Sequence, residues 1–311
     1  MIHHRAPWVS IGWALSMAFS TFAMAQTNVN TEIIPTGKLR VGINGSNATL
    51  YVRATDGSAT GISTDFGKFI ADKLGVPFEP VVYSGAATYT ASFGKGEWDI
   101  IVTGRNPLAA KRVDFMPDVI LIDYVFLAAP GREFSGPDQV DRAGVKIGVP
   151  RNASADAFLS QRLKSAELVR LAGDATVATE MLRDGKIDLY ATGTDSVQRI
   201  ADRLPGSKII GVFDTVAFAI STAKGWSPEA KSRLTQLVNE AKAAGIVQKA
   251  VENPDKRACA PRRDTPRARR SPSWMPRCPE VYVYAKFFLL ARLRPDVEWR
   301  GRAKILRPWK L

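Results

Sequence analysis

The sequence predicts an α/β fold of two lobes, each a mostly parallel sheet flanked by helices, with two hinge crossings between them. Short apolar runs bounded by turn-forming residues alternate with amphipathic segments of helical length, as in parallel strands connected by helices. This alternation stops at Pro130-Gly131 and then starts again, which indicates a second unit. The chain has 311 residues, enough for two units of ordinary size.

The first lobe is predicted to span residues 38–127 and to be completed by residues 215–253. Thr64 is expected to cap its first helix, and Gly75 to end that helix. Residues Pro228–Val251 are expected to close the lobe as one long amphipathic helix. The other elements expected in this lobe are strands Leu39–Ile43, Phe78–Tyr83 and Asp99–Thr103, and helices Asp65–Leu74 and Ala87–Phe93.

The second lobe is predicted to span residues 128–214. The chain is expected to cross between the lobes near Val125–Pro130 and near Thr215–Ile220, and the second crossing includes an apolar strand over Val216–Ser221. The elements expected in this lobe are strands Lys146–Val149, Leu168–Leu171, Asp188–Thr192 and Lys208–Val212, and helices Ser154–Leu163, Thr176–Asp184 and Ser196–Leu204.

Residues 1–25 are predicted to be a cleaved signal peptide. A short basic start precedes an apolar stretch over Val9–Ala23 that is too short to span a membrane comfortably, and Ala23-Met24-Ala25 forms a small-x-small cleavage site. An uncleaved anchor is the alternative. Residues 26–37 are expected to form a flexible lead, and the mature protein is expected in the periplasm.

The final segment, residues 254–311, differs in composition from the rest of the chain. It holds 16 Lys/Arg and 5 Asp/Glu and so carries +11 of the net charge of +13, which leaves +2 for residues 1–253. Its Arg- and Pro-rich start is expected to be disordered. It is either a basic appendage for a membrane or nucleic acid, or the product of a reading-frame slip, and the abrupt change favours the slip. The nearly neutral body predicts no nucleic-acid partner.

One stretch, Trp98–Phe115, is expected to meet the ligand. A buried strand ends at Gly104, and Asn106-Pro107 opens a loop and a short helical turn that carry Arg105, Asn106, Lys111 and Arg112. Ligands of open α/β sheets sit just beyond the carboxyl ends of strands. The alternative is an ordinary strand-to-helix corner with solvated Lys and Arg.

The motifs taken in order resemble the family 3 periplasmic solute-binding proteins, the receptors of amino-acid-type ABC importers. The resemblance covers residues 38–252 and rests on LRVGI, Gly61-x-x-x-Asp65, WDIIVTG, VDF, VKIGVPRNASADAFL, DGKIDLYATG and AKAAGIVQKAVE. It implies a type II periplasmic binding fold, in which two lobes close on a small solute by hinge bending, and a membrane permease as partner. A monomer is expected.

Nothing in the sequence demands catalysis. The two histidines, His3 and His4, fall in the predicted signal peptide, so the mature chain has no histidine for a base or a metal ligand. Cys259 and Cys278 lie in the final segment at a separation that matches no metal pattern. We therefore expect no enzyme activity, no cofactor and no metal.

The resemblance also implies ligand contacts, and the first of them departs from the family. In amino-acid binders of this family, an Arg six residues before the Phe of VDF makes a bidentate contact with the ligand carboxylate through its guanidinium group. Here that position is Ala109, and Asn106 takes the place of the family Thr three residues earlier. Either Arg105 or Arg112 supplies a displaced cation, or both are solvated.

The remaining contacts are carried over with alternatives. Asn152 and Ser154 open a helix whose start favours an anion, although Ser154 also suits an N-cap. The family Asp that pairs with the ligand ammonium would fall at Gly193, and Asp195 two residues later is either its substitute or a helix cap. Asn44 and Tyr51 lie on a first-lobe loop where the family places polar and aromatic contacts.

Of the three groups with which the family binds an α-amino acid, two are therefore absent or shifted. The Arg is missing at Ala109, and the Asp is missing at Gly193, with Asp195 two residues later. The hypothesis is that the solute is not a standard α-amino acid; a small organic acid or another polar metabolite fits equally well. The alternatives are an exported enzyme of dehydratase or lyase type on the same scaffold, with Asp65 or Asp195 as its acid, and a ligand-sensing module.

Overall fold

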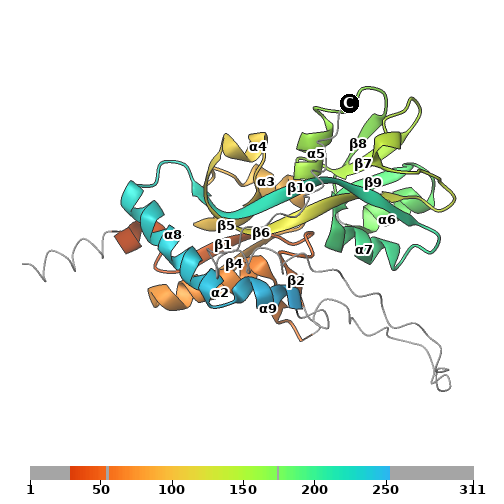
Figure 1. Ribbon diagram of the computed structural model, residues 1–311. Helices are drawn as coiled ribbons and strands as arrows, with labels where there is room; N and C mark the ends of the chain where they lie inside the picture. The colour runs from red at the N-terminus through yellow and green to blue at the C-terminus, as the bar shows by residue number, and fades with distance from the viewer. Residues whose placement is uncertain (1–28, 54–55, 174, 253–311) are drawn as a thin grey trace, which may run out of the picture. The chain divides into compact units, whose positions relative to one another are not determined.

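One mixed sheet of eight strands organises the computed structural model, in the order β4-β1-β5-β10-β6-β9-β7-β8 (Figure 1). The structure describes residues 29–53, 56–173 and 175–252. The strands of this sheet are β1 (Leu39–Asn44), β4 (Phe78–Tyr83), β5 (Ile100–Gly104), β6 (Val113–Ala128), β7 (Lys146–Pro150), β8 (Glu167–Leu171), β9 (Leu189–Gly193) and β10 (Lys208–Ala223). A separate small hairpin pairs β2 (Val52–Arg53) with β3 (Ala59–Thr60).

The sheet has two parallel halves that are connected by a pair of long antiparallel strands. In the first half β1 pairs in parallel with β4 and β5, and in the second half β7 pairs in parallel with β8 and β9. Between them β6 and β10, of 16 residues each, run antiparallel from Val113↔Ala223 to Lys208↔Ala128. This arrangement confirms the predicted α/β fold class.

The second crossing was predicted as two strands, Lys208–Val212 and Val216–Ser221, and this was wrong. They form one strand, β10. The register of its pairing with β6 shifts near Gly211 and Asp214, but the pairing continues on both sides of these shifts. Gly211 has φ 137, a conformation that glycine adopts without steric cost. A β-bulge of this kind bends a strand locally without ending it.

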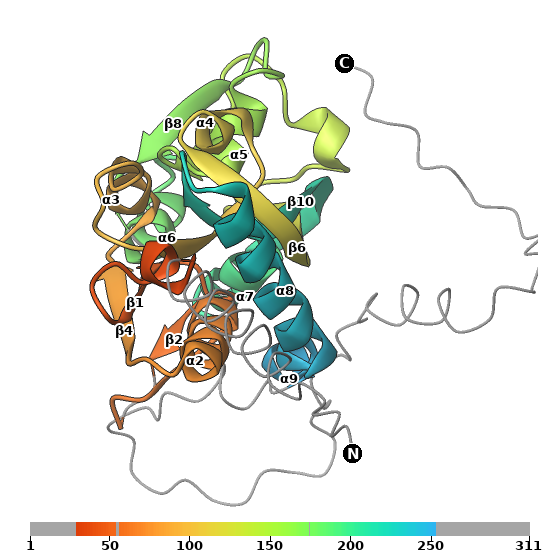
Figure 2. The ribbon, with the colours of Figure 1, turned by 90° about the vertical axis from the view of Figure 1, so that its left-hand side faces the viewer.

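Helices cover both sides of the first half. Helix α2 (Ile62–Leu74) buries Phe66 and Ile70 against the sheet and packs on α8 (Pro228–Ala243) and α9 (Ile246–Glu252). Helix α3 (Ala86–Ala91) lies on the other side of the β4–β1–β5 strands in both views (Figures 1 and 2). Strand β5 is therefore buried along its whole length, which accounts for its unbroken apolar run.

The second half is built in the same way from shorter helices. They are α5 (Ser154–Leu159), α6 (Ala175–Arg183) and α7 (Thr194–Ala201), with a 3₁₀ turn at Pro137–Gln139. Helix α5 ends four residues before the predicted Leu163, and α7 starts two residues before the predicted Ser196. Val125, Leu182 and Val197 belong to one buried cluster between these helices and the sheet.

Two local predictions were wrong for identifiable reasons. Helix α2 begins at Ile62 with Gly61 as its N-cap, so Thr64 does not cap it; Gly61 has φ 121, and a Cβ there would lie 2.6 Å from the carbonyl oxygen of Leu50. The closing helix is split into α8 and α9 because Gly245 adopts φ 75.

The predicted flexible lead, residues 26–37, is partly ordered. Residues 29–33 are helical and Ile33 is fully buried. The Glu32 carboxylate accepts hydrogen bonds from the backbone N–H and the hydroxyl of Ser227, both at 2.6 Å, and Ser227 caps α8. A buried apolar side chain and a carboxylate at a helix start thus hold this segment to the body.

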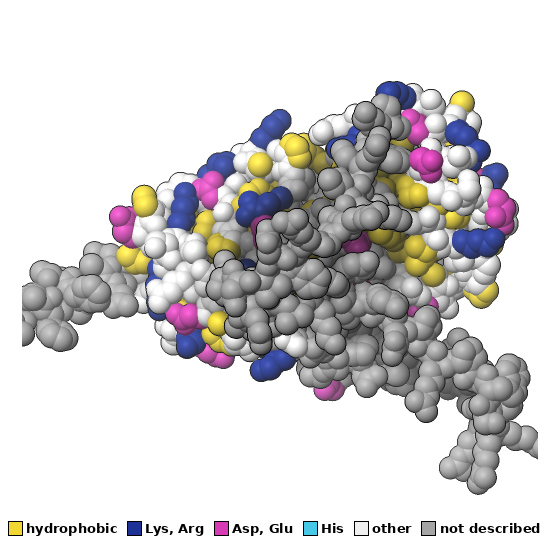
Figure 3. Space-filling view, in the orientation of Figure 1, with side chains coloured by type: hydrophobic (Ala, Val, Ile, Leu, Met, Phe, Trp, Pro, Cys, Tyr) yellow, Lys and Arg dark blue, Asp and Glu magenta, His cyan; other side chains and the backbone are white. Residues whose placement is uncertain are grey.

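Charges of both signs are interspersed on the visible face of the described residues (Figure 3). Among the described residues no helix is long and apolar enough to cross a membrane, and no group of three or more His, Cys, Asp or Glu side chains is placed to hold a metal ion. The predicted signal peptide, residues 1–25, and the predicted tail, residues 254–311, lie outside the described residues.

Candidate ligand-binding site

A cavity of about 410 Å³ lies where parallel strands from both halves of the sheet end. Its lining includes Asn44 at the end of β1, Thr103 and Gly104 at the end of β5, Pro150 at the end of β7 and Thr192 in β9. This is where open α/β sheets bind ligands, and the volume falls in the range of small-molecule sites. Of the eight predicted contact residues, five line it: Asn44, Asn106, Arg112, Asn152 and Ser154.

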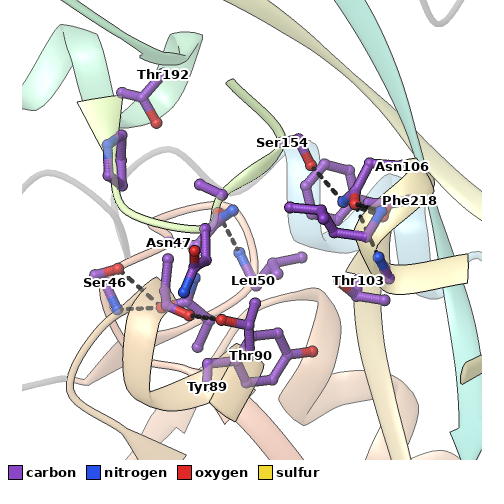
Figure 4. A pocket seen from close by; sticks show the side chains of 18 of the residues that line it. Ser46, Asn47, Leu50, Tyr89, Thr90, Thr103, Asn106, Ser154, Thr192 and Phe218 are labelled. Carbon is purple, nitrogen blue, oxygen red and sulfur yellow. Dashed lines mark hydrogen bonds between the residues drawn. The ribbon is translucent and has the colours of Figure 1, made fainter. Parts of the chain in front are cut away.

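Asn106 holds the loop after β5 and also contacts the second half. Its side-chain oxygen accepts hydrogen bonds from the backbone N–H of Leu108 (3.0 Å) and of Ala109 (2.9 Å), which caps α4 (Pro107–Ala110). Its amide nitrogen donates to the Gly104 carbonyl (3.1 Å) and to the Ser154 hydroxyl (3.3 Å). Figure 4 shows Asn106 and Ser154 facing each other on one side of the cavity, with Thr192 on the other.

Ser154 is one of the points where the two halves approach each other closely. A Cβ on Gly104 would lie 2.7 Å from the Ser154 hydroxyl oxygen, so a glycine is required at the end of β5. Tyr124 also lines the cavity, and burial raises the pKa of this tyrosine to about 12. Ser154 is not an N-cap as the alternative held, because Ala153 occupies that position.

The start of α5 already has a carboxylate. The buried Asp156 accepts a hydrogen bond from the backbone N–H of Asn152 (2.9 Å) and forms an ion pair with Arg170 (2.9 Å). Asn152 has φ 61, a left-handed conformation that asparagine tolerates better than most residues. The positive helix end predicted to attract a ligand anion is thus partly satisfied from within the protein.

The basic residues after β5 fall into two groups. Arg105 lies outside the cavity lining: its Nε donates to the Asp118 carboxylate at 2.5 Å, its Nη2 donates to the Met116 carbonyl at 2.8 Å, and its guanidinium group stacks on Phe115. Lys111 and Arg112 are exposed and line the cavity. Among the described residues, neither of these two side chains has a hydrogen-bond or ion-pair partner.

Ala109 stands where the family has an Arg. It is buried in a cluster with Tyr89, Phe93 and Trp98, and it also lines the cavity. A methyl group at this position brings no charge to the cavity. Among the described residues, the charge at the cavity comes instead from the two residues that follow α4.

The first-half loop contributes different residues from those predicted. Asn44 lines the cavity, and its side-chain oxygen accepts hydrogen bonds from the backbone N–H (3.2 Å) and the hydroxyl (2.8 Å) of Ser46. Tyr51 is half-buried and outside the lining, whereas Ser46, Asn47 and Leu50 line it. The Asn-Gly-Ser-Asn run at 44–47 was the available signal, because such residues favour tight turns with exposed polar groups.

Asp195 connects the two halves and does not line the cavity. Its carboxylate accepts a hydrogen bond from the hydroxyl of Thr49 at 2.8 Å, and Thr49 is almost fully buried. Gly193 is the N-cap of α7, so Asp195 is not a cap either. Thr192 and Ser196, which both carry hydroxyl groups, line the cavity at this end of β9.

Aromatic residues form much of the remaining wall, and sequence reasoning did not find them. They are Tyr89, Phe93, Tyr124, Tyr190 and Phe218. The Tyr89 hydroxyl donates to the Val102 carbonyl at 3.0 Å, and complete burial raises the pKa of this tyrosine. Tyr124 and Phe218 each begin a run of buried residues, on β6 and β10 respectively, and so the sequence alone did not distinguish the face that turns toward the cavity.

A family model described as bacterial extracellular solute-binding proteins, family 3, matches residues 39–253. The chain belongs to this family, which confirms the resemblance found in its motifs.

Two curated relatives are 25% identical to the chain. One is the cyclohexadienyl dehydratase of Pseudomonas aeruginosa, over 195 residues that cover 61% of this chain and 71% of the relative. The other is the L-cystine-binding protein TcyJ of Escherichia coli, over 179 residues, 56% of this chain and 66% of the relative. The chain therefore matches about two thirds of the length of these relatives.

Solved structures support the fold. A mutant of the arginine-binding protein ArgBP from T. maritima has a TM-score of 0.63 at 20% identity and covers 72% of this chain and 98% of its own. An ancestral amino acid-binding protein, described as a precursor of cyclohexadienyl dehydratase, has a TM-score of 0.62 at 20% identity, with 72% and 97% covered. The chain thus has the α/β periplasmic-binding-protein fold.

Proposed function

We propose that the protein is an exported periplasmic receptor of an ABC importer. It captures a small polar or anionic solute, an amino acid or a related organic acid, between two hinged lobes and presents it to a membrane permease. One observation carries the proposal: a single cavity of small-molecule size is lined by residues from both halves of the sheet. Membership of the solute-binding family supports it.

The lobes proposed are residues 38–127 with 215–253, and residues 128–214. In this proposal β6 and β10 are the hinge, because they are the long strands that belong to both halves. Bending two strands changes few backbone torsions and leaves each half rigid. The hydrogen bonds of Asn106 with Ser154 and of Thr49 with Asp195 then help to hold the closed form.

The contacts proposed for the solute are those that line the cavity. Asn44, Asn106, Asn152 and Ser154 offer polar groups, and Arg112 with Lys111 offers positive charge. Arg105 and Asp195, which are bonded within the protein, are proposed to fix the loop after β5 and the contact between the halves. Tyr51, half-buried and outside the lining, is assigned no contact with the solute.

An exported dehydratase is the second candidate, because one relative at 25% identity is a cyclohexadienyl dehydratase. A dehydratase needs a group that donates a proton to the leaving hydroxyl. The two acids considered from the sequence do not lie at the cavity: Asp195 holds Thr49, and the Asp65 carboxylate accepts from the backbone N–H of Gly61 at 3.3 Å. These positions favour a receptor.

A thermal-shift screen of the full chain against amino acids, dicarboxylates, sugar acids and polyamines tests the proposal. A solute that binds only the folded state stabilises it by about 2.7 kcal/mol at 100 times its dissociation constant. Mass spectrometry of each hit after incubation separates the two candidates, since a receptor returns the solute unchanged and a dehydratase returns it without water. A folded protein that binds no member of these classes contradicts the receptor.

A further inference from the structure

Among the described residues, the charged side chains that line the cavity are positive. Lys111 and Arg112 both line it, both are exposed, and neither has a partner for its charge among the described residues. Two adjacent cations at a cavity attract an anion and raise its local concentration. A carboxylate of the solute is the group that pairs best with them.

The opposite end of the cavity presents hydroxyl groups. Thr192 and Ser196 line it at the end of β9, beside the position where an ammonium-binding carboxylate was expected. The neighbouring carboxylate, Asp195, accepts the Thr49 hydroxyl and lies outside the lining. A hydroxyl or a carbonyl oxygen of a solute matches Thr192 and Ser196, whereas an ammonium group removed from water needs a charged partner.

Aromatic residues line the cavity as well. They are Tyr89, Tyr124, Tyr190 and Phe218, and the Tyr89 hydroxyl is bonded within the protein to the Val102 carbonyl. Such walls favour an apolar or aromatic body on the solute.

We infer that the solute is a small carboxylate with an apolar or aromatic body and a hydroxyl or keto group where an amino acid carries its ammonium. This inference rests on the proposed receptor function and narrows its ligand class. Lys111 and Arg112 hold the carboxylate, and Thr192 with Ser196 selects an uncharged oxygen over a cation.

Matched pairs of solutes test it, because each pair differs only in the group in question. The probes are L-3-phenyllactate with L-phenylalanine, L-2-hydroxyisocaproate with L-leucine, and L-2-hydroxyglutarate with L-glutamate, titrated calorimetrically into the full chain. We expect the hydroxy acid of at least one pair to bind about tenfold more tightly or better, a difference of one charged contact. Amino acids that bind as tightly as their hydroxy partners in every pair that binds overturn the inference and leave the receptor standing. Binding of neither set by a folded protein overturns the inference, and the wider solute screen then decides the receptor.

Two variants sharpen the result. Thr192→Asp places a carboxylate at the end of β9 and should shift the preference towards the amino acid of the pair by about tenfold, while the neutral Thr192→Asn should not. A Thr192→Asp protein with unchanged preference contradicts the role given to Thr192. Asp174 lies outside the described residues, so Asp174→Asn is included: loss of amino-acid binding in that variant would identify a carboxylate for the ammonium and overturn the inference.

Discussion

On the first-half side of the cavity, the loop after β5 leaves Lys111 and Arg112 without partners among the described residues. On the second-half side, the nearby carboxylates are bonded inside the protein, Asp156 to Arg170 and Asp195 to Thr49. A charged side chain near a cavity is therefore not available to a solute when it is already bonded within the protein. We therefore expect charge changes on the first-half side to alter binding, and those on the second-half side to alter stability.

The largest effect is expected where the two sides touch. In Gly104→Ala the new Cβ would lie 2.7 Å from the Ser154 hydroxyl and 2.9 Å from Val216, so the halves could not approach as closely. We expect loss of solute binding and a lower free energy of unfolding by about 1–3 kcal/mol. Urea titration and calorimetry measure the two effects.

Adding Ser154→Ala to this variant removes the hydroxyl oxygen and should restore part of the binding. Normal binding by Gly104→Ala alone would show that closure does not bring these residues together.

The next effect concerns the second-half side alone. Arg170→Met leaves the buried Asp156 without its cation and should lower the free energy of unfolding by about 1–3 kcal/mol. Solute affinity should change little, since Arg170 does not line the cavity. A large loss of solute affinity at unchanged stability would contradict the expectation that charge changes on the second-half side alter stability and not binding.

The parts of this contrast that depend on residues close together in the sequence could be predicted, whereas those that depend on distant residues could not. The buried strand over residues 100–104 and the turn at Asn106-Pro107 follow from short-range patterns, and so the loop was correctly expected at a strand end. The direction of Arg105 was not predictable, because its partners Asp118 and Met116 lie on β6 and meet it only after folding.

The same limit applies to the fold. The alternation of strands and helices was visible as periodicity in the sequence. That residues 208–223 form one strand, β10, depends on its long pairing with β6, which the sequence did not reveal. Likewise, the burial of Ala109 depends on α3, which packs on the loop from another part of the chain.

A smaller effect is expected at the contact between the halves. Thr49→Val removes the hydroxyl that donates to Asp195 and should cost about 1 kcal/mol of stability. Solute affinity should fall a few-fold if this bond forms only in the closed protein. Thr60→Val, in β3, is the matched control. Equal stability and affinity of the two variants would contradict the role given to Thr49 in the contact between the halves.

The smallest effect concerns an acid of the first half, Asp114, that does not line the cavity. Lys231 and Lys224 lower the pKa of Asp114 below its usual range. The stabilisation from these two ion pairs is therefore present at pH values above the pKa of Asp114 in the unfolded chain, about 4. It is lost as the pH falls through the lower pKa of Asp114 in the folded protein. Wild type should lose more stability than Asp114→Asn on acidification below about pH 4, as measured by urea titration at several pH values. Parallel curves for the two proteins would contradict this.

The most direct measurement is the affinity of the double variant Lys111→Met/Arg112→Met for the tightest hydroxy acid of the matched pairs. Its control is Lys95→Met/Arg183→Met, which removes the same two residue types from exposed positions outside the cavity. The account predicts that the first double variant keeps its stability and binds about a hundredfold more weakly, while the control binds as wild type does. Equal affinity of the two double variants would contradict the claim that the solute is held by the unpaired cations of the loop after β5.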